Sequence, residues 1–77
     1  MKEFLVRLSS FEEVKRFVAL TSRYPYPVHA VCADKRTNAK SLIGLFSMDL
    51  SRPVTVRAEG GAADTDLLLR EAAQFLA

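Results

Sequence analysis

The chain has 77 residues, of which 49 % are hydrophobic and 26 % are charged, a composition that fits one small folded domain and excludes a disordered chain. Its net charge of +2 comes from short, scattered clusters, so it gives no electrostatic case for nucleic acid. We see no signal peptide, no apolar span of about 18 residues and no possible internal disulfide, which predicts a reduced, cytoplasmic protein without a membrane partner. One cysteine and one histidine offer too few ligands for zinc, so no metal or cofactor is expected.

Two elements are predicted in the first 24 residues. Residues 4–8 alternate between the two faces of a half-buried strand. Residues 9–24 change to a helical period, and Ser10 with Glu13 fits a capping box at the helix start. The apolar stripe of this helix consists of Phe11, Val14, Phe17, Val18 and Thr21.

The middle of the chain reads as a hairpin followed by a short helix. Pro25 and Pro27 end the preceding helix, because neither can donate a hydrogen bond and each disfavours helix in the residue before it. A strand is predicted at 28–33. A tight turn at 34–35 follows it, and the short return strand of the hairpin is predicted at 36–39. Residues 41–48 then form a short, strongly apolar helix.

The last third predicts one strand and one helix. Residues 53–59 alternate again, and the glycines after them break the chain. The final helix is capped by Asp64 or Thr65, and its apolar stripe is formed by Leu68, Ala72, Phe75 and Leu76. The order β-α-β-β-α-β-α predicts a single α+β domain over residues 1–77. In it, three helices cover one face of a four-stranded antiparallel sheet and leave the other face open.

The segments "NAKSLIGLFSMDL" (38–50) and "VTVRAEG" (54–60) resemble the second half of HPr, the histidine-containing phosphocarrier of the bacterial sugar phosphotransferase system. The resemblance covers residues 22–62, is looser in the last helix and is poor over residues 1–16. It implies the open-faced β-sandwich of that family, in agreement with the order of elements.

The resemblance lacks its chemical centre. HPr carries phosphate on a histidine at the start of the first helix, with an arginine two residues later. Counting back without a gap from the matched segment puts Ser10 at the histidine's place and Glu12 at the arginine's. A serine phosphate ester is too stable for the relay, and Glu12 would repel phosphate. His29 lies in the middle of a predicted strand, on the face away from the helices. We therefore predict a divergent, non-catalytic HPr-like protein without carrier chemistry.

Ser41 is the candidate site of regulation. In some HPr proteins a dedicated kinase phosphorylates the matching serine, and the product binds a transcriptional regulator; Lys40, Ser41 and Gly44 fit that pattern. Phosphate at a helix N-cap gains from free N–H groups and from the helix dipole. Serine is also a favoured N-cap in its own right, which explains the residue without any modification.

The helix after Ser41 carries more apolar side chains than one sheet face can bury. In HPr the matching positions dock partner proteins, so the resemblance implies a docking surface formed by Lys40, Leu42, Ile43 and Phe46. The alternative is that Leu45 and Met48 are core and the other side chains are partly covered. Basic residues surround this surface in HPr, whereas the matching positions here include Glu12, Ala19 and Ser22, which implies different partners.

The open sheet face is predicted to be more apolar than a solvent face needs, which leaves a monomer and a weak homodimer both open. Its members are Leu5, Arg7, His29, Val31, Ala33, Thr55, Arg57 and Glu59.

Four other functions are alternatives to this one. An active phosphocarrier with a displaced site would need His29 beside a helix terminus and an arginine. The order of elements also suits a ferredoxin-like small-molecule sensor or an RNA-recognition module, but the paired surface aromatics that stack bases are missing. A hydrolase is disfavoured, because no nucleophile–base pair is visible.

Overall fold

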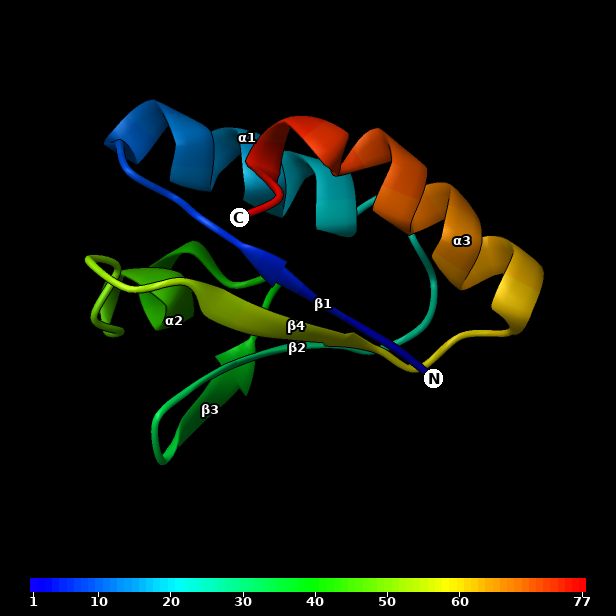
Figure 1. Cartoon of the computed structure of the whole chain (residues 1–77), viewed down its shortest axis with the longest axis horizontal. Helices are drawn as coiled ribbons and strands as arrows, with labels where there is room; N and C mark the ends of the chain where they lie inside the picture. The colour runs from blue at the N-terminus through cyan, green and yellow to red at the C-terminus, as the bar shows by residue number, and fades with distance from the viewer.

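The computed structural model describes all 77 residues, and its elements follow the predicted order (Figure 1). The strands are β1 (Lys2–Val6), β2 (Val28–Cys32), β3 (Lys35–Asn38) and β4 (Val54–Ala58). The helices are α1 (Phe11–Thr21), α2 (Leu42–Phe46) and α3 (Ala62–Glu71), and a 3₁₀ turn (Ala73–Phe75) follows α3.

The four strands form one antiparallel sheet in the order β1-β4-β2-β3. The last strand, β4, is therefore central, with Val56 opposite Phe4 on one side and opposite Ala30 on the other. Helices α1 and α3 both lie over the same face of this sheet (Figure 1), and α2 packs against α1 and β3. The predicted α+β, open-faced sandwich is confirmed.

The core fills the space between β4 and the helices. Val54, Val56 and Ala58 of β4 are all completely buried, because the period-2 alternation of the strand puts them on the helix-covered face. Phe17 of α1 is also fully buried, and its ring meets Phe75 edge to face with 5.4 Å between centroids. This contact joins the first helix to the C-terminal turn.

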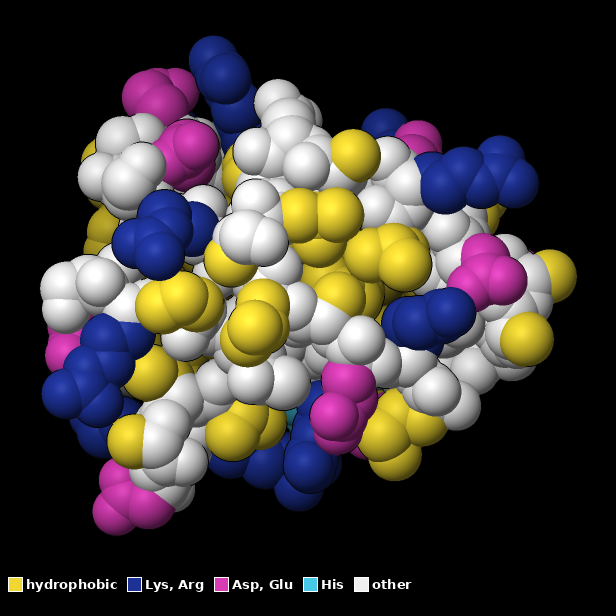
Figure 2. All heavy atoms as spheres, in the orientation of Figure 1, with side chains coloured by type: hydrophobic (Ala, Val, Ile, Leu, Met, Phe, Trp, Pro, Cys, Tyr) yellow, Lys and Arg dark blue, Asp and Glu magenta, His cyan; other side chains and the backbone are white.

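The C-terminal residues run beside β1. The amide of Arg7 donates to the Phe75 carbonyl at 2.7 Å, and the amide of Ala77 donates to the Leu5 carbonyl at 3.1 Å. Leu76 thereby forms an antiparallel β-bridge with Val6. Its side chain is 42 % exposed, so its predicted place in the buried stripe of the last helix was wrong. Figure 2 shows hydrophobic side chains gathered over this part of the surface, with charged side chains around them.

The start of the chain differs from the prediction in its limits. Strand β1 covers Lys2–Val6, two residues earlier than predicted, although Leu8 is still buried. Helix α1 is shorter than the predicted 9–24. Leu20 is buried in its apolar stripe, whereas Phe11 is 56 % exposed. Placing Phe11 in the core was wrong.

The helix caps also differ. Ser10 caps α1 as predicted, since its Oγ accepts the Glu13 amide at 3.2 Å. The Glu13 carboxylate, however, binds Ser9 instead of completing a capping box with Ser10. Helix α3 begins at Ala62 behind Gly61, which makes no side-chain cap, so the predicted cap at Asp64 or Thr65 was wrong. Thr65 is buried and its hydroxyl donates to the Gly61 carbonyl at 3.0 Å.

Candidate functional site

The candidate regulatory serine stands at the N-cap of α2, as predicted. Its Oγ accepts the Gly44 amide at 3.0 Å, and its backbone is extended, with φ −106° and ψ 116°. The residues before it are tied to the end of α1: the Thr21 hydroxyl donates to the Ala39 carbonyl at 2.9 Å, and the Lys40 ammonium donates to the Tyr24 carbonyl. The start of α2 is therefore fixed by α1 as well as by its own cap.

Gly44 is required by packing. A Cβ built at this position would meet the Thr37 hydroxyl of β3, and would lie 3.2 Å from the Ser41 side chain. A larger residue fits there only if the Thr37 side chain rotates or β3 moves away from α2. The glycine of the Lys-Ser-aliphatic-aliphatic-Gly pattern thus has a structural role that needs no ligand.

The apolar residues of α2 divide into a buried and an exposed set. Leu45 is fully buried and Met48 is 7 % exposed, so the alternative that these two are core residues was right. Ile43 is 84 % exposed and Phe46 is 43 % exposed, while Leu42 is partly buried against the core. Two large apolar side chains of the predicted docking surface therefore face solvent.

The residues at the degenerate phosphocarrier position begin α1. Ser10 is exposed and caps the helix, and Glu12 is exposed within 3.9 Å of the Lys15 ammonium. Between them, the ring of Phe11 stacks on Phe46 with 5.2 Å between centroids and 13° between planes. Lys15 Nζ lies over the same Phe11 ring, 5.3 Å from its centroid. The structure thus brings the start of α1 and the end of α2 together.

The contact between these two aromatic rings was not predicted from the sequence. Phe11 follows the helical apolar period, so periodicity assigned it to the core. The one available signal was its position as the first residue of the helix, directly after the cap Ser10.

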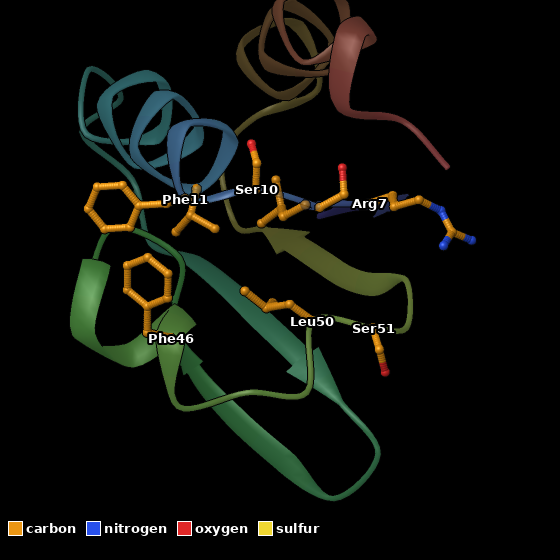
Figure 3. Close-up of a pocket in the computed structure, with 9 residues that line it drawn as sticks. Arg7, Ser10, Phe11, Phe46, Leu50 and Ser51 are labelled. Atoms are coloured by element: carbon orange, nitrogen blue, oxygen red, sulfur yellow. The ribbon is translucent and has the colours of Figure 1, made fainter.

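A hollow of ≈ 420 Å³ opens beside the aromatic pair (Figure 3). Figure 3 shows Phe11 and Phe46 at one end, Arg7 at the other, and Leu50 and Ser51 along the edge between them. Its lining is formed by Arg7, Leu8, Ser9, Ser10, Phe11, Val14, Phe46, Leu50 and Ser51. It therefore joins the end of β1, the start of α1, the end of α2 and the loop before β4.

Hydrogen bonds from two serines that line this hollow lower the pKa of the carboxyl groups to which they are bonded. Hydrogen bonds from the side chain and amide of Ser9 lower the pKa of Glu13 below its ordinary value of 4.5. In the loop before β4, hydrogen bonds from Ser51 lower the pKa of Asp49 below 3.8. Both carboxylates accept N–H and O–H donors, which favour the charged form.

His29 lies elsewhere. It is in the middle of β2, opposite Arg57 of β4, with its side chain 22 % exposed and its Nε2 paired with Glu59. The partner of its side chain is the Glu59 carboxylate and not the N-terminus of a helix. The displaced-carrier alternative required a helix terminus there, so the geometry does not support it. No group of three or more acidic, histidine or cysteine side chains is placed to hold a metal ion.

Charged side chains on the open sheet face form ion pairs with one another. Arg57 Nε lies 2.5 Å from Glu3, and Arg36 lies 3.9 Å from Glu59. Leu5, at 50 % exposure, is the one large apolar side chain that this face exposes strongly. No helix is long and apolar enough to cross a membrane.

Comparison with solved structures gives the fold. Over 96 % of its length the chain superposes on HPr-C-His from Thermoanaerobacter tengcongensis, covering 92 % of that chain with a TM-score of 0.77 and 23 % identity. It also superposes over 96 % of its length on the histidine-containing phosphocarrier protein of a Mycoplasma, covering 98 % of that chain with a TM-score of 0.68 and 14 % identity. No protein-family model and no curated protein sequence matches. The protein has the HPr fold along nearly its whole length, which argues against a ferredoxin-like sensor domain.

Proposed function

We propose that the chain is a divergent member of the HPr family that has lost phosphoryl-carrier chemistry and acts as a non-catalytic, regulatory protein-binding module. The proposal depends most on two neighbouring residues at the start of α1, Ser10 and Phe11. A helix-capping serine stands where the fold's phosphocarriers would need a histidine, and a phenylalanine beside it stacks on α2.

Ser10 is a poor phosphoryl carrier for chemical reasons. A phosphoramidate on histidine transfers its phosphoryl group readily, whereas a serine ester does not. No base activates Ser10, because the Glu13 carboxylate is already bonded to Ser9. Glu12 and Glu13 also add negative charge to the first turn of α1, and this charge opposes an incoming phosphate.

The docking surface that we propose comprises Lys40, Leu42, Ile43 and Phe46, enlarged by Phe11. Its support is the exposure of Ile43 and Phe46, and the stacking of Phe11 on Phe46. Large apolar side chains exposed together on a small domain are characteristic of protein interaction sites. The partner is a protein that does not depend on the basic ring of HPr, because Glu12, Ala19 and Ser22 occupy matching positions on α1.

A pull-down from native lysate tests the docking surface. The Phe46→Ala variant is compared with wild type and with Leu67→Ala, a matched control on α3 whose side chain is 48 % exposed. We expect proteins captured by wild type and by Leu67→Ala to be missing from the Phe46→Ala sample. Identical catches from all three would exclude this surface.

Ser41 is the proposed regulatory phosphorylation site, with an HPr kinase as the modifying enzyme and a transcriptional regulator as the reader. Its support is the N-cap geometry and the neighbouring Lys40 ammonium, which could leave the Tyr24 carbonyl for a phosphate. Incubation with an HPr kinase and ATP should add the mass of one phosphate to wild type and none to Ser41→Ala. An unchanged wild-type mass would end this part of the proposal.

We further propose a cytoplasmic protein that is monomeric or at most weakly dimeric. The charges of the open sheet face pair within the chain, which leaves little to hold a second copy. Light scattering over a concentration series should therefore give the monomer mass, with at most a small rise at the highest concentration. A constant dimer mass would contradict it.

A further inference from the structure

We propose that the hollow between α1, α2 and the loop before β4 is a socket for one bulky apolar side chain of a partner protein, with an acidic residue next to it in the partner's sequence. This inference rests on the proposed protein-binding function and adds the chemistry of the partner.

The apolar part of the ligand follows from the lining. Five of the nine lining residues are hydrophobic, and the aromatic pair closes one end (Figure 3). Pockets that enclose whole small molecules span about 300–1,000 Å³, and the hollow, at ≈ 420 Å³, lies near the lower end of that range. It therefore has room for a leucine, methionine or phenylalanine side chain together with neighbouring atoms of its chain.

The polar side chains of the hollow are mostly committed to the protein itself. Ser9 donates to Glu13 at 2.6 Å, Ser51 donates to Asp49 at 2.5 Å, and Ser10 accepts the Glu13 amide. The hydroxyl protons of Ser9 and Ser51 are thus used within the chain, and Ser10 is the one serine of the hollow that still has a proton to donate. Together with the five apolar lining residues, this favours an apolar group over a sugar.

Arg7 is the exception. It is exposed at the end of the hollow opposite the aromatic pair (Figure 3), and no carboxylate of the chain lies within 4 Å of its guanidinium. The other arginine nearby, Arg52, is 3.6 Å from Asp49. A single unpaired cation at the rim of an apolar hollow is complementary to a single negative charge beside an apolar group.

The apolar surface continues beyond the hollow, and this favours a protein over a small amphiphile. Phe46 lines the hollow and also belongs to α2, where Ile43 is 84 % exposed. A fatty acid held in the hollow would leave Ile43 uncovered, whereas a protein segment can fill the hollow and cover Ile43 at once. We therefore commit to a protein segment.

Selection from a random peptide library displayed on phage tests the inference directly. We expect the enriched peptides to carry a leucine, methionine or phenylalanine adjacent to aspartate or glutamate. The synthetic form of the most enriched peptide, titrated into ¹⁵N-labelled protein, should shift the amides of Phe11 and Leu50. Failure to enrich any peptide, enrichment of basic peptides, or shifts confined to another face would each overturn the socket.

Variants then test the charged and the apolar parts of the socket separately. Arg7→Glu and Phe11→Ala should each weaken binding of that peptide about tenfold. Arg70→Glu, an exposed change on α3, should leave it within a factor of two. Both Arg7 and Phe11 are exposed, so we expect the variants to fold, and their far-ultraviolet circular dichroism checks this. Equal affinity of Arg7→Glu and wild type would remove the acidic half of the inference.

Two further outcomes separate this inference from the proposed function. Decanoate, a small amphiphile with one carboxylate, is titrated in parallel; if it shifts the lining residues and no peptide does, the socket is a small-molecule site and the inference is wrong. If peptides bind elsewhere on α2, the result supports the proposed protein-binding function and refutes the socket. Uptake of acid-labile phosphate from a phosphotransferase system would instead refute the proposed function itself.

Discussion

The ring of Phe11, the first residue of α1, stacks on the ring of Phe46, the last residue of α2, with 5.2 Å between their centroids. Both rings are also exposed in part, Phe11 by 56 % and Phe46 by 43 %. The contact joins two segments 35 residues apart in sequence (46 − 11 = 35). It lies next to the N-cap Ser10 and forms part of the docking surface that we propose.

The stacked pair should contribute to stability as well as to binding. Measured in a double-mutant cycle, Phe11→Ala and Phe46→Ala should show a coupling free energy of about 0.5 kcal/mol, at the low end for aromatic pairs because both rings are half in solvent. Urea unfolding of wild type, both single variants and the double variant gives this value. Strictly additive losses would mean that the rings do not stack in solution.

Gly44→Ala should destabilise the protein, although alanine is the better helix former by about 1 kcal/mol. The new methyl group would collide with the Thr37 hydroxyl of β3, and overpacking of this kind costs about 1–3 kcal/mol. The control is the double variant Thr37→Ala/Gly44→Ala, which lacks the hydroxyl and should lose less stability relative to Thr37→Ala. A stabilised Gly44→Ala variant would show that the new methyl group does not meet the Thr37 side chain.

The cap of α2 makes a separate prediction. Ser41→Ala should lower the free energy of unfolding by about 1 kcal/mol, because the Gly44 amide loses its acceptor. Ser41→Asp should retain most of the stability, since aspartate is also a favoured N-cap. Thermal unfolding monitored by circular dichroism compares the three proteins. Equal stability of Ser41→Ala and wild type would argue that the cap is not formed.

Glu13 predicts a specific pH dependence. Its pKa is lowered in the folded protein by the hydrogen bonds from Ser9, so its ionised form stabilises the fold. That contribution is complete above the ordinary value of 4.5 and is lost as pH falls through the lower, folded-state pKa. The difference in unfolding free energy between wild type and Glu13→Gln should therefore be largest above about pH 5 and shrink in acid.

A control makes that measurement specific. Glu12→Gln changes the neighbouring first-turn carboxylate, whose partner Lys15 lies 3.9 Å away across an exposed surface, so its effect should be small. A stability difference for Glu13→Gln that stays constant between about pH 3 and pH 7 would show that the Ser9 bonds are absent.

The sequence predicted the architecture because each element carries a periodic signal. The alternation of 53–59 identified the buried residues of the central strand, and Ser41 marked the start of α2 correctly. The limits of α3 were missed because its N-cap is Gly61, which has no side chain to signal a cap. The pattern at Asp64 and Thr65 looked like a start but lies inside the first turns of the helix.

The candidate site was only half predictable. The exposure of Ile43 and Phe46 follows from the surplus of apolar residues in so short a helix. The partnership of Phe46 with Phe11, the hollow beside them and the unpaired Arg7 depend on how α1, α2 and the loop before β4 meet in space. The periodicity of residues within one element does not predict how that element packs against the others.

The proposed loss of phosphoryl-carrier chemistry is tested most directly by incubating the protein with phosphoenolpyruvate and the first enzyme of a bacterial phosphotransferase system. The product is weighed before and after mild acid treatment, and the Mycoplasma histidine-containing phosphocarrier protein is run in parallel as the control that should be labelled. The account predicts no added mass on this chain under conditions that phosphorylate the control. One acid-labile phosphate per chain, lost in a His29→Gln variant, would contradict it.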